Sequence, residues 1–242
     1  MIKNGMGLAR LNFSWGTHEE YRSNIQMIRN EARELKKKIP IIQDLSGPRV
    51  TKGNGHFFDK TIKKILTKKD LADLDFAKEQ GIDFVAQSFV GDSRDVIYLR
   101  GEMARRNFNK PIIAKIERKK ALENIDGIIA ESDAIMIGRG DLGNEIALEE
   151  IPYVQSEIIK KAKRASKPVI VATEMMLSMM RSPIPTRADV SDTTCAIIEG
   201  ADAVMLSEET AIGDFPSEAV LMMNKIILEA EKRGIVKKIN QL

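Results

Sequence analysis

Lys115 and Glu117 carry opposite charges two residues apart, at the end of the apolar segment Pro111–Ile116. Residues two apart on a β-strand point to the same face, so this spacing aims an ammonium group and a carboxylate at one place. One interpretation is a structural ion pair. The other is chemical: Glu117 holds a divalent cation, and Lys115 meets an anionic substrate.

A glycine-rich segment, Gly138–Gly143 (GRGDLG), supplies a second carboxylate at Asp141. Backbone N–H groups in such a loop can hold an anion. Two carboxylates with substrate oxygens and waters form the usual Mg²⁺ arrangement. The alternative is a tight turn that requires glycine. The segment is not a P-loop, because no Gly-Lys-Ser/Thr follows it.

Polar side chains also follow the other apolar segments that are typical of strands. In chain order they are Arg10, Asn12 and Ser14; Asp44; Gln87 and Ser88; Thr173 and Glu174; and Ser207 and Glu208. A single polar strand end only marks where a strand meets solvent. In a (β/α) barrel, however, the carboxyl ends of the strands form the active-site face, so the series predicts a polar mouth.

Seven apolar segments alternate with amphipathic stretches, which predicts seven strands, each followed by a helix. The strands are expected at Gly7–Asn12, Pro40–Asp44, Phe84–Phe89, Pro111–Ile116, Ala134–Ile137, Pro168–Ala172 and Ala203–Leu206. Thr17, Thr67 and Thr186 each precede an acidic residue by three positions, which predicts capped helix starts. Alternation of this kind predicts a parallel sheet. Seven such units in a row favour an α/β fold of the TIM-type (β/α) barrel over an open doubly wound sheet.

The composition excludes several classes of protein. The 242 residues have a formal net charge of +3, with 43% hydrophobic and 30% charged residues, as in an ordinary globular protein. Neither nucleic-acid binding nor a membrane span is expected, because the sequence shows no basic stripe with aromatics and no sufficiently long apolar run. The single cysteine, Cys195, excludes a disulfide framework and is expected to pack within a helix. A cytoplasmic setting fits this cysteine usage.

Longer stretches of the chain resemble pyruvate kinase. They are Ala9–Tyr21 (ARLNFSWGTHEEY), Asp44–Pro48 (DLSGP), Leu66–Val90, Ile112–Glu117 (IIAKIE), Ile135–Ile146 (IMIGRGDLGNEI), Pro168–Met180, Pro185–Thr193 and Gly200–Pro216. These stretches cover nearly all of the chain in the family's order. The resemblance implies the barrel domain of the phosphoenolpyruvate/pyruvate enzymes over residues 1–234, with a tail at 235–242.

The resemblance also implies roles for the charged residues. Glu117 and Asp141 would hold Mg²⁺ or Mn²⁺ against the carboxylate and 2-oxygen of the substrate. Lys115 would stabilise enolate charge and the transferring phosphoryl group, and Arg10 would contact the phosphate of phosphoenolpyruvate. A cation that bridges these oxygens stabilises an enolate as a Lewis acid, and a neighbouring lysine adds to that stabilisation.

Further roles follow in the same way. The backbone amides of Gly140 and Asp141, together with Thr173, would bind the substrate carboxylate, while Thr173 and Ser207 would lie near the proton path. The family's monovalent-cation site falls on Asn12, Ser14, Asp44 and Leu45. Arg49 stands where the family has Glu with a K⁺ requirement or Lys without one. Arg49 is therefore expected to supply the positive charge itself and to remove the need for K⁺.

The sequence departs from the family where the nucleotide binds. The family carries a lid domain after its DLSGP-like motif, and only Thr51–Leu66 fills that place here. Such a lid excludes water during transfer. Trp15 and Thr51 stand where the family has His and Arg that contact nucleotide phosphates. We therefore expect weak phosphoryl transfer.

The ends of the chain differ from the family as well. No regulatory domain is expected after Arg233, and the family's first barrel strand is expected to be missing ahead of Met1. An open barrel would expose two strand edges. The tail segment Ile235–Ile239 is a candidate strand for the vacant slot. A partner subunit is a second way to close the barrel, and a third interpretation is a start codon further upstream or a degenerate remnant of the barrel.

Three functional hypotheses remain. The first is a pyruvate-kinase-like enzyme that binds Mg²⁺ and pyruvate or phosphoenolpyruvate and performs enolate chemistry on a 2-oxo acid, such as proton exchange, decarboxylation or aldol cleavage. The second is a truncated kinase with residual transfer to ADP. The third is a non-catalytic ligand-binding or partner module, favoured by the altered residues Arg118, Glu174 and Glu208.

Overall fold

The computed structural model describes residues 1–52, 55–59, 61–62 and 64–235. The chain divides into two compact units. The N-terminal unit is Leu8–Ile135, and the C-terminal unit is Met1–Gly7 together with the chain from Met136 onward. Each unit is described by itself.

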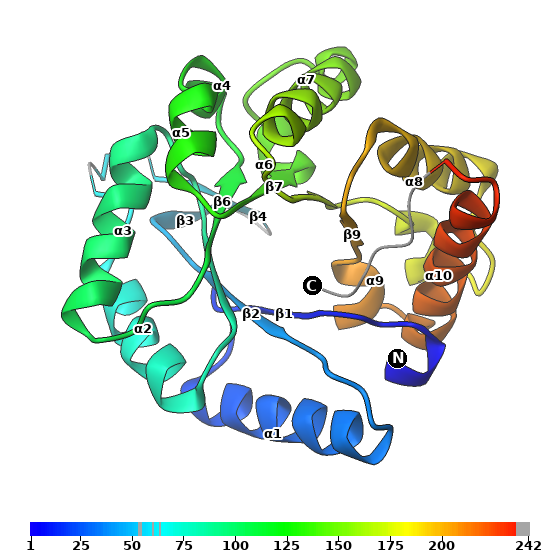
Figure 1. The fold of residues 1–242 in the computed structure, drawn as a ribbon, viewed down its shortest axis with the longest axis horizontal. Helices are drawn as coiled ribbons and strands as arrows, with labels where there is room; N and C mark the ends of the chain where they lie inside the picture. The colour runs from blue at the N-terminus through cyan, green and yellow to red at the C-terminus, as the bar shows by residue number, and fades with distance from the viewer. Residues whose placement is uncertain (53–54, 60, 63, 236–242) are drawn as a thin grey trace. The chain divides into compact units, whose positions relative to one another are not determined.

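The N-terminal unit alternates parallel strands with helices on one side of them (Figure 1). Its elements are β1 (Ala9–Asn12), α1 (His18–Glu34), β2 (Ile41–Leu45), β3 (Arg49–Lys52), β4 (Gly55–Phe58), α2 (Lys68–Gln80), β5 (Phe84–Gln87), α3 (Ser93–Arg105), β6 (Ile112–Ile116), α4 (Lys119–Glu123) and α5 (Ile125–Glu131). The strands pair in the order β1-β2-β5-β6. Asn12 lies opposite Asp44, and Leu45 lies opposite Gln87. This register brings the polar carboxyl ends of neighbouring strands to one edge.

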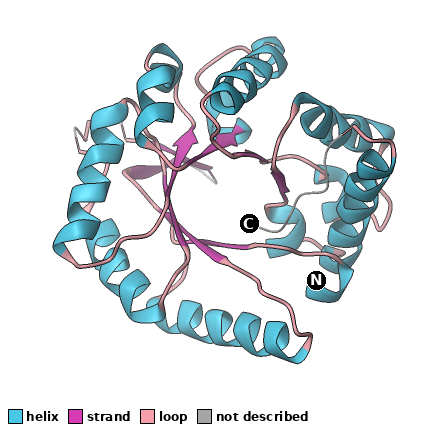
Figure 2. Ribbon diagram, viewed as in Figure 1, coloured by secondary structure: helices cyan, strands magenta, loops and turns pink. Residues whose placement is uncertain are grey.

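The C-terminal unit repeats the same alternation (Figure 2). Its elements are η1 (Ile2–Asn4), β7 (Ala134–Gly138, which begins at the unit boundary), α6 (Arg139–Gly143), η2 (Leu148–Glu150), α7 (Ile151–Arg164), β8 (Val169–Ala172), η3 (Leu177–Met180), α8 (Arg187–Glu199), β9 (Ala203–Met205), α9 (Glu208–Ala211) and α10 (Pro216–Lys232). Strands β8 and β9 are parallel, with Ala172 opposite Met205.

The strands form because continuous aliphatic runs can be buried on both faces of a parallel sheet. Every residue of β2, β6 and β8 is buried. The helices begin where the sequence predicts. The side chains of Thr17, Thr67 and Thr186 each accept a hydrogen bond from the backbone N–H of the third residue of the helix. The acidic side chain of that third residue accepts a hydrogen bond from the backbone N–H of the threonine. Helix ends would otherwise leave these donors unpaired.

The α/β fold with seven parallel strands is confirmed, whereas several local predictions were wrong. The segment Gly138–Gly143, expected as a loop, forms the short helix α6 from its second residue onward. Residues 49–58, where no strand was predicted, contain the antiparallel hairpin β3–β4. Cys195, expected to pack, is exposed.

Two predictions lie outside what the structure tests. The tail strand falls almost wholly on residues 236–242, outside the described residues. The single domain over 1–234 stays a prediction. Among the described residues, no helix has the length and apolar character needed to cross a bilayer.

Candidate active site

Lys115 is the centre of a buried polar cluster in the N-terminal unit. Its Nζ lies 2.7 Å from Glu117 Oε1 and 3.1 Å from Asp44 Oδ2, and it donates a hydrogen bond of 2.9 Å to Ser88 Oγ. The Lys115 side chain is only 4% exposed. The predicted facing of Lys115 and Glu117 is seen in this contact, with Lys115 on β6 and Glu117 directly after its end.

Asp44 is the anionic hub of the same cluster. Arg10 contacts Asp44 Oδ2 through Nε at 2.8 Å and through its terminal nitrogen at 2.6 Å, while Ser88 Oγ lies 3.2 Å from Oδ1. Burial alone raises the pKa of Asp44, but the cations of Arg10 and Lys115 outweigh it and hold that pKa below its ordinary value. Asp44 therefore stays ionised.

Glu117 is held at both oxygens. Oε1 faces Lys115, and Oε2 accepts a 2.8 Å hydrogen bond from the backbone N–H of Phe89. Two carboxylates, Asp44 and Glu117, thus balance two cations, Arg10 and Lys115. An anionic ligand and a divalent cation entering together would keep this balance, since each would find a counter-charge already in place.

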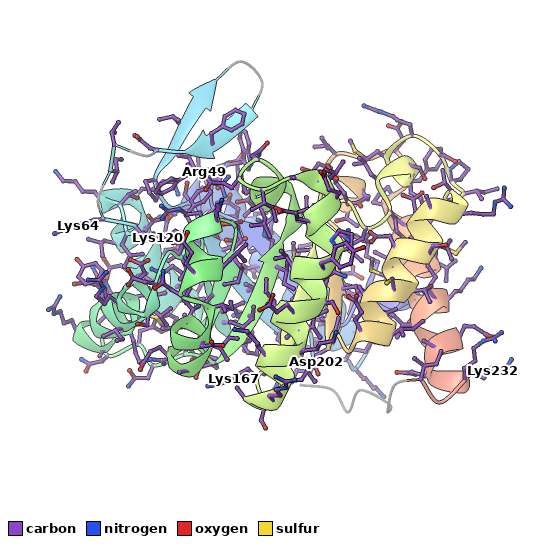
Figure 3. All side chains as sticks on the ribbon, turned by 90° about the horizontal axis from the view of Figure 1, so that it is seen from above. Arg49, Lys64, Lys120, Lys167, Asp202 and Lys232 are labelled. Carbon is purple, nitrogen blue, oxygen red and sulfur yellow. The ribbon has the colours of Figure 1, made fainter. Side chains whose placement is uncertain are left out.

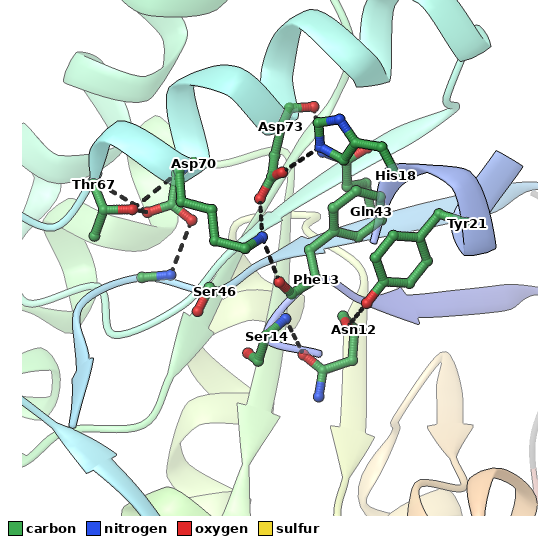
Figure 4. Close-up of polar contacts among 12 residues, drawn as sticks. Asn12, Phe13, Ser14, His18, Tyr21, Gln43, Ser46, Thr67, Asp70 and Asp73 are labelled. Carbon is green, nitrogen blue, oxygen red and sulfur yellow. Dashed lines mark hydrogen bonds and ion pairs between the residues drawn. The ribbon is translucent and has the colours of Figure 1, made fainter. Parts of the chain in front are cut away.

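Asn12, Ser14 and Leu45, expected at a monovalent-cation site with Asp44, lie beside this cluster. Asn12 Oδ1 accepts the Ser14 N–H at 3.2 Å (Figure 4). Ser14 Oγ is buried without a hydrogen-bond partner among the described residues. Arg49, expected to replace the cation, donates from Nε to Ser46 O at 2.9 Å, at the base of the hairpin (Figure 3).

A second network, which the sequence did not predict, ties α2 to the start of α1 and to the loop after β1. Asp73 is 1% exposed, and its carboxylate contacts His18 Nε2 at 2.7 Å and Lys69 Nζ at 2.6 Å. Lys69 also donates to Phe13 O (Figure 4). His18, in the first turn of α1, is thus a hydrogen-bond partner of a buried carboxylate. Only the spacing of Lys69 and Asp73 on one helix face could have indicated part of this network.

Arg139 organises the C-terminal unit, and only its place between two glycines marks it in the sequence. It forms a two-pronged contact with Asp192, both distances being 2.7 Å, and donates to Thr173 O at 2.8 Å and Glu174 O at 3.1 Å. Thr173 and Glu174 have φ of 76° and 56°. Arg139 therefore holds two successive residues in the left-handed region of backbone conformation, which residues other than glycine rarely adopt.

Gly140 and Thr173, two predicted substrate contacts, are brought together. A Cβ added at Gly140 would lie 2.8 Å from Thr173 Cγ2, so only glycine allows this approach. Asp141 lies in the first turn of α6 and is half-buried.

The end of β9 is fixed by a buried carboxylate. Glu209 is fully buried and accepts the Ser207 N–H at 2.7 Å and the Met176 N–H at 3.0 Å. Ser207 Oγ is buried with no hydrogen-bond partner among the described residues. Glu174 and Glu208 are exposed. The predicted residues thus fall into two sets: Arg10, Asp44, Lys115 and Glu117 touch one another in the N-terminal unit, whereas Gly140, Asp141, Thr173 and Ser207 belong to the C-terminal unit.

A hollow of about 420 Å³ opens elsewhere in the N-terminal unit. It is lined by Trp15, Gly16, Glu20, Tyr21, Ser23 and Asn24. None of the charged residues of the Lys115 cluster lines it. The cluster is the better candidate for chemistry, because it combines burial, charge and direct contacts.

Parallel strands with charged and hydroxyl side chains at their carboxyl ends define the class of α/β proteins whose active sites lie at that edge. The family model "Pyruvate kinase, barrel domain" matches residues 1–64 and 61–220. The chain therefore belongs to the pyruvate kinase family, through its barrel domain.

Individual relatives agree with this assignment. A pyruvate kinase of Sporosarcina psychrophila is 35% identical over an alignment that covers 96% of this chain and 54% of the relative. One from Thermococcus litoralis is 34% identical, covering 96% and 66%. One from Agrobacterium vitis is 53% identical over 69% of this chain and 34% of the relative. The chain thus spans about half the length of the first of these relatives.

The alignments also locate a deletion. The match to the Sporosarcina protein is 314 positions long, although this chain has 242 residues, so at least 72 positions fall opposite gaps in this chain. The two segments of the family match meet at residues 61–64, shortly after the hairpin β3–β4. The position agrees with the short segment Thr51–Leu66 of the sequence.

Proposed function

We propose that this chain binds a divalent cation together with pyruvate or phosphoenolpyruvate, and that it interconverts a 2-oxo acid with its enolate more readily than it transfers a phosphoryl group to ADP. The single observation that carries the proposal is the buried Lys115, which lies within 3.1 Å of Asp44 and Glu117. A buried ammonium group between carboxylates is positioned to stabilise developing oxyanion charge.

The residues present fit a magnesium or manganese ion by their donor chemistry. Among the described residues no group of three or more His, Cys, Asp and Glu forms a protein-only metal site. Mg²⁺ does not require one, because it takes one or two carboxylates and completes its shell with water and substrate oxygens. Glu117 and Asp141 are proposed as these carboxylates. When bound, the cation supplies Lewis-acid stabilisation of an enolate.

The chain's own side chains then divide the remaining work. Lys115 faces the developing negative charge, and Arg10 offers a guanidinium to a phosphate or carboxylate. Gly140 and Thr173 form a close pair that accepts the substrate carboxylate, and Ser207 is proposed near the proton path. Asp44, which is fully buried, contacts both Arg10 and Lys115 through Oδ2 and orients them.

Phosphoryl transfer to ADP is the second candidate function. The relatives named above are pyruvate kinases, and Arg10 and Lys115 are present here. Against efficient transfer stand the deletion of at least 72 positions and the exposed Trp15 at a nucleotide position. Water exclusion, which transfer requires, would be reduced.

The test follows the methyl protons of pyruvate by NMR in D₂O with Mg²⁺. We expect loss of the methyl signal above the metal-only background, and Lys115→Met should remove it, because the ammonium that stabilises the enolate is gone. Lys120→Met, a change at a half-exposed lysine, is the matched control and should retain exchange. Exchange at the background rate with the unaltered chain would refute enolate chemistry on pyruvate.

The same assay tests the monovalent cation. We propose that Arg49 replaces K⁺, so that exchanging potassium chloride for choline chloride leaves the rate unchanged. A strong dependence on potassium would show instead that Asn12, Ser14, Asp44 and Leu45 still require the ion.

A further inference from the structure

The base of the β3–β4 hairpin packs against Phe89, the residue whose N–H holds Glu117. Arg49 on β3 and Phe58 on β4 lie directly opposite each other. The Arg49 guanidinium lies 4.6 Å from the centroid of the Phe89 ring, and the centroids of the Phe58 and Phe89 rings are 5.3 Å apart. The hairpin therefore clamps Phe89 with a cation on one strand and a ring on the other.

Arg118, which lies far from the hairpin in the sequence, also contacts both Phe58 and Phe89. Its guanidinium stacks 3.7 Å from the centroid of the Phe58 ring and donates to Phe89 O at 3.3 Å. Arg118 thus contacts the hairpin and the backbone of Phe89 at the same time. It also directly follows Glu117 in the chain, so that one short segment contributes both the carboxylate and part of the clamp.

Phe89 requires such a clamp because of its backbone. Its φ is 58°, in the left-handed region, and its side chain is 1% exposed. A residue other than glycine keeps this conformation only when its surroundings determine it. Gly47, at φ 64°, leaves space for the Phe89 ring, because a Cβ at position 47 would lie 3.0 Å from Phe89 Cδ2. In this conformation the Phe89 N–H points at Glu117 Oε2.

We propose that Phe89, Phe58 and Arg118 are positioning residues for the carboxylate of Glu117, and that the β3–β4 hairpin is the element that keeps this carboxylate oriented toward a divalent cation. The inference rests on the proposed function for its ligand. Glu117 would hold the cation through its carboxylate, and the Phe89 N–H would continue to fix Oε2. Substitution of residues that hold a metal ligand in place typically lowers metal affinity 10- to 100-fold.

The test replaces Phe58 by Ala and measures two quantities. The first is Mn²⁺ affinity by electron paramagnetic resonance, and the second is hydrogen exchange of the Phe89 amide by NMR. We expect about 10-fold weaker Mn²⁺ binding and clearly faster exchange at Phe89. Phe57→Ala is the matched control, because Phe57 is the neighbouring phenylalanine of the same strand, is 36% exposed and pairs with Val50 instead.

Two further variants separate positioning from loss of folding. Phe58→Tyr keeps the ring and should restore both quantities. Arg118→Met removes both the contact with Phe89 O and the stacking on the Phe58 ring while both rings are kept, and it should shift both quantities in the same direction as Phe58→Ala. Equal Mn²⁺ affinity and equal Phe89 exchange in Phe58→Ala and Phe57→Ala would overturn the proposal.

The outcome also distinguishes this inference from the proposed function. If the unaltered chain binds no Mn²⁺, the proposed function fails, and the positioning role is then decided by the Phe89 exchange alone. If Mn²⁺ binds equally in all variants while Phe89 exchange differs, the proposed function survives, and the proposed link from the hairpin to the carboxylate is wrong.

Discussion

Asp44 shows how one buried carboxylate can organise a site. Arg10, Lys115 and Ser88 all contact it, and it is fully buried. Desolvation alone would favour its neutral form. Two cations reverse that preference and keep the pKa below its ordinary value. The charge on Asp44 thus depends on partners from two other strands.

We expect Asp44→Asn to lower the free energy of unfolding at pH 7 by about 3–5 kcal/mol, because it removes the buried counter-charge of Arg10 and leaves Lys115 with Glu117 alone. The native pKa lies below the unfolded one, so the carboxylate contributes stability above the ordinary Asp range and loses it as the pH falls through the native pKa. The variant should therefore lose less stability on acidification. Urea unfolding across pH 3 to 7 measures both effects.

Asp75→Asn is the matched control for this change. Asp75 also pairs with an arginine, but its side chain is 65% exposed. Exposed pairs contribute about 0–1 kcal/mol. If Asp44→Asn destabilises the chain no more than Asp75→Asn does, the ionised, buried state of Asp44 is wrong.

Single residues also mark where prediction from sequence ends. The facing of Lys115 and Glu117 follows from strand periodicity alone. The role of Asp44 as the shared counter-ion of Arg10 and Lys115 does not, because it depends on how β1, β2 and β6 are arranged in the sheet. Arg139 and Phe89 could not be predicted either, since both act through positive-φ backbone that neighbouring segments impose.

At the scale of elements, the helix starts were the most predictable features. Thr67 and Asp70 illustrate the reason: the whole capping box lies within four residues, so no tertiary contact is needed to recognise it. The structure adds a further contact, because Asp70 also accepts the N–H of Gly47 at 3.1 Å. Burial, the largest effect, raises the pKa of Asp70. The α2 start therefore also fixes the loop after β2.

Thr67 only caps the helix, whereas Asp70 also binds the loop, so the two residues are expected to contribute differently to the free energy of unfolding. Thr67→Ala should lower the free energy of unfolding by about 1 kcal/mol, the usual cost of a lost cap. Asp70→Ala should lower it by roughly 1–3 kcal/mol more, because it also leaves the buried Gly47 N–H without its partner. Urea unfolding of both variants measures this, with Thr186→Ala at α8 as a second simple cap. Equal losses for Thr67→Ala and Asp70→Ala would exclude a role of Asp70 in the loop.

The hairpin β3–β4 is the element that sequence reasoning missed. Its strands are four residues each, and the glycines near its turn favour a loop as much as a hairpin. What stabilises it is the stacking of Arg49, Phe58, Phe89 and Arg118, which come from three separate parts of the chain. Interactions of this kind follow only from the folded arrangement.

At the scale of the whole molecule, the deletion matters most for the reaction. The chain matches the barrel-domain family in two segments and lacks at least 72 aligned positions of a relative. The parts proposed for enolate chemistry lie within the matched segments. The stretch that would cover a nucleotide does not have a counterpart of similar length.

We therefore expect ADP phosphorylation by phosphoenolpyruvate to be slower than pyruvate methyl exchange under the same conditions. Phosphorus NMR of ADP and phosphoenolpyruvate with the chain and Mg²⁺, beside the proton experiment, gives the ratio of the two rates. A transfer rate that equals or exceeds methyl exchange would reverse the order of the two candidate functions. Lys115→Met should abolish both activities.

The pairing of Arg49 with Phe58 has a consequence for how such chains change length over evolution. Residues that face each other across an antiparallel pair have Cα atoms about 4.5–5.5 Å apart. The two ends of the segment that joins Arg49 to Phe58 are therefore already close together. Lengthening a connection between fixed ends costs only about 0.6 kcal/mol for each doubling. The base of the hairpin is therefore a site that tolerates insertion and deletion. A segment whose own ends lie close together can be added or removed there while the parallel strands keep their register.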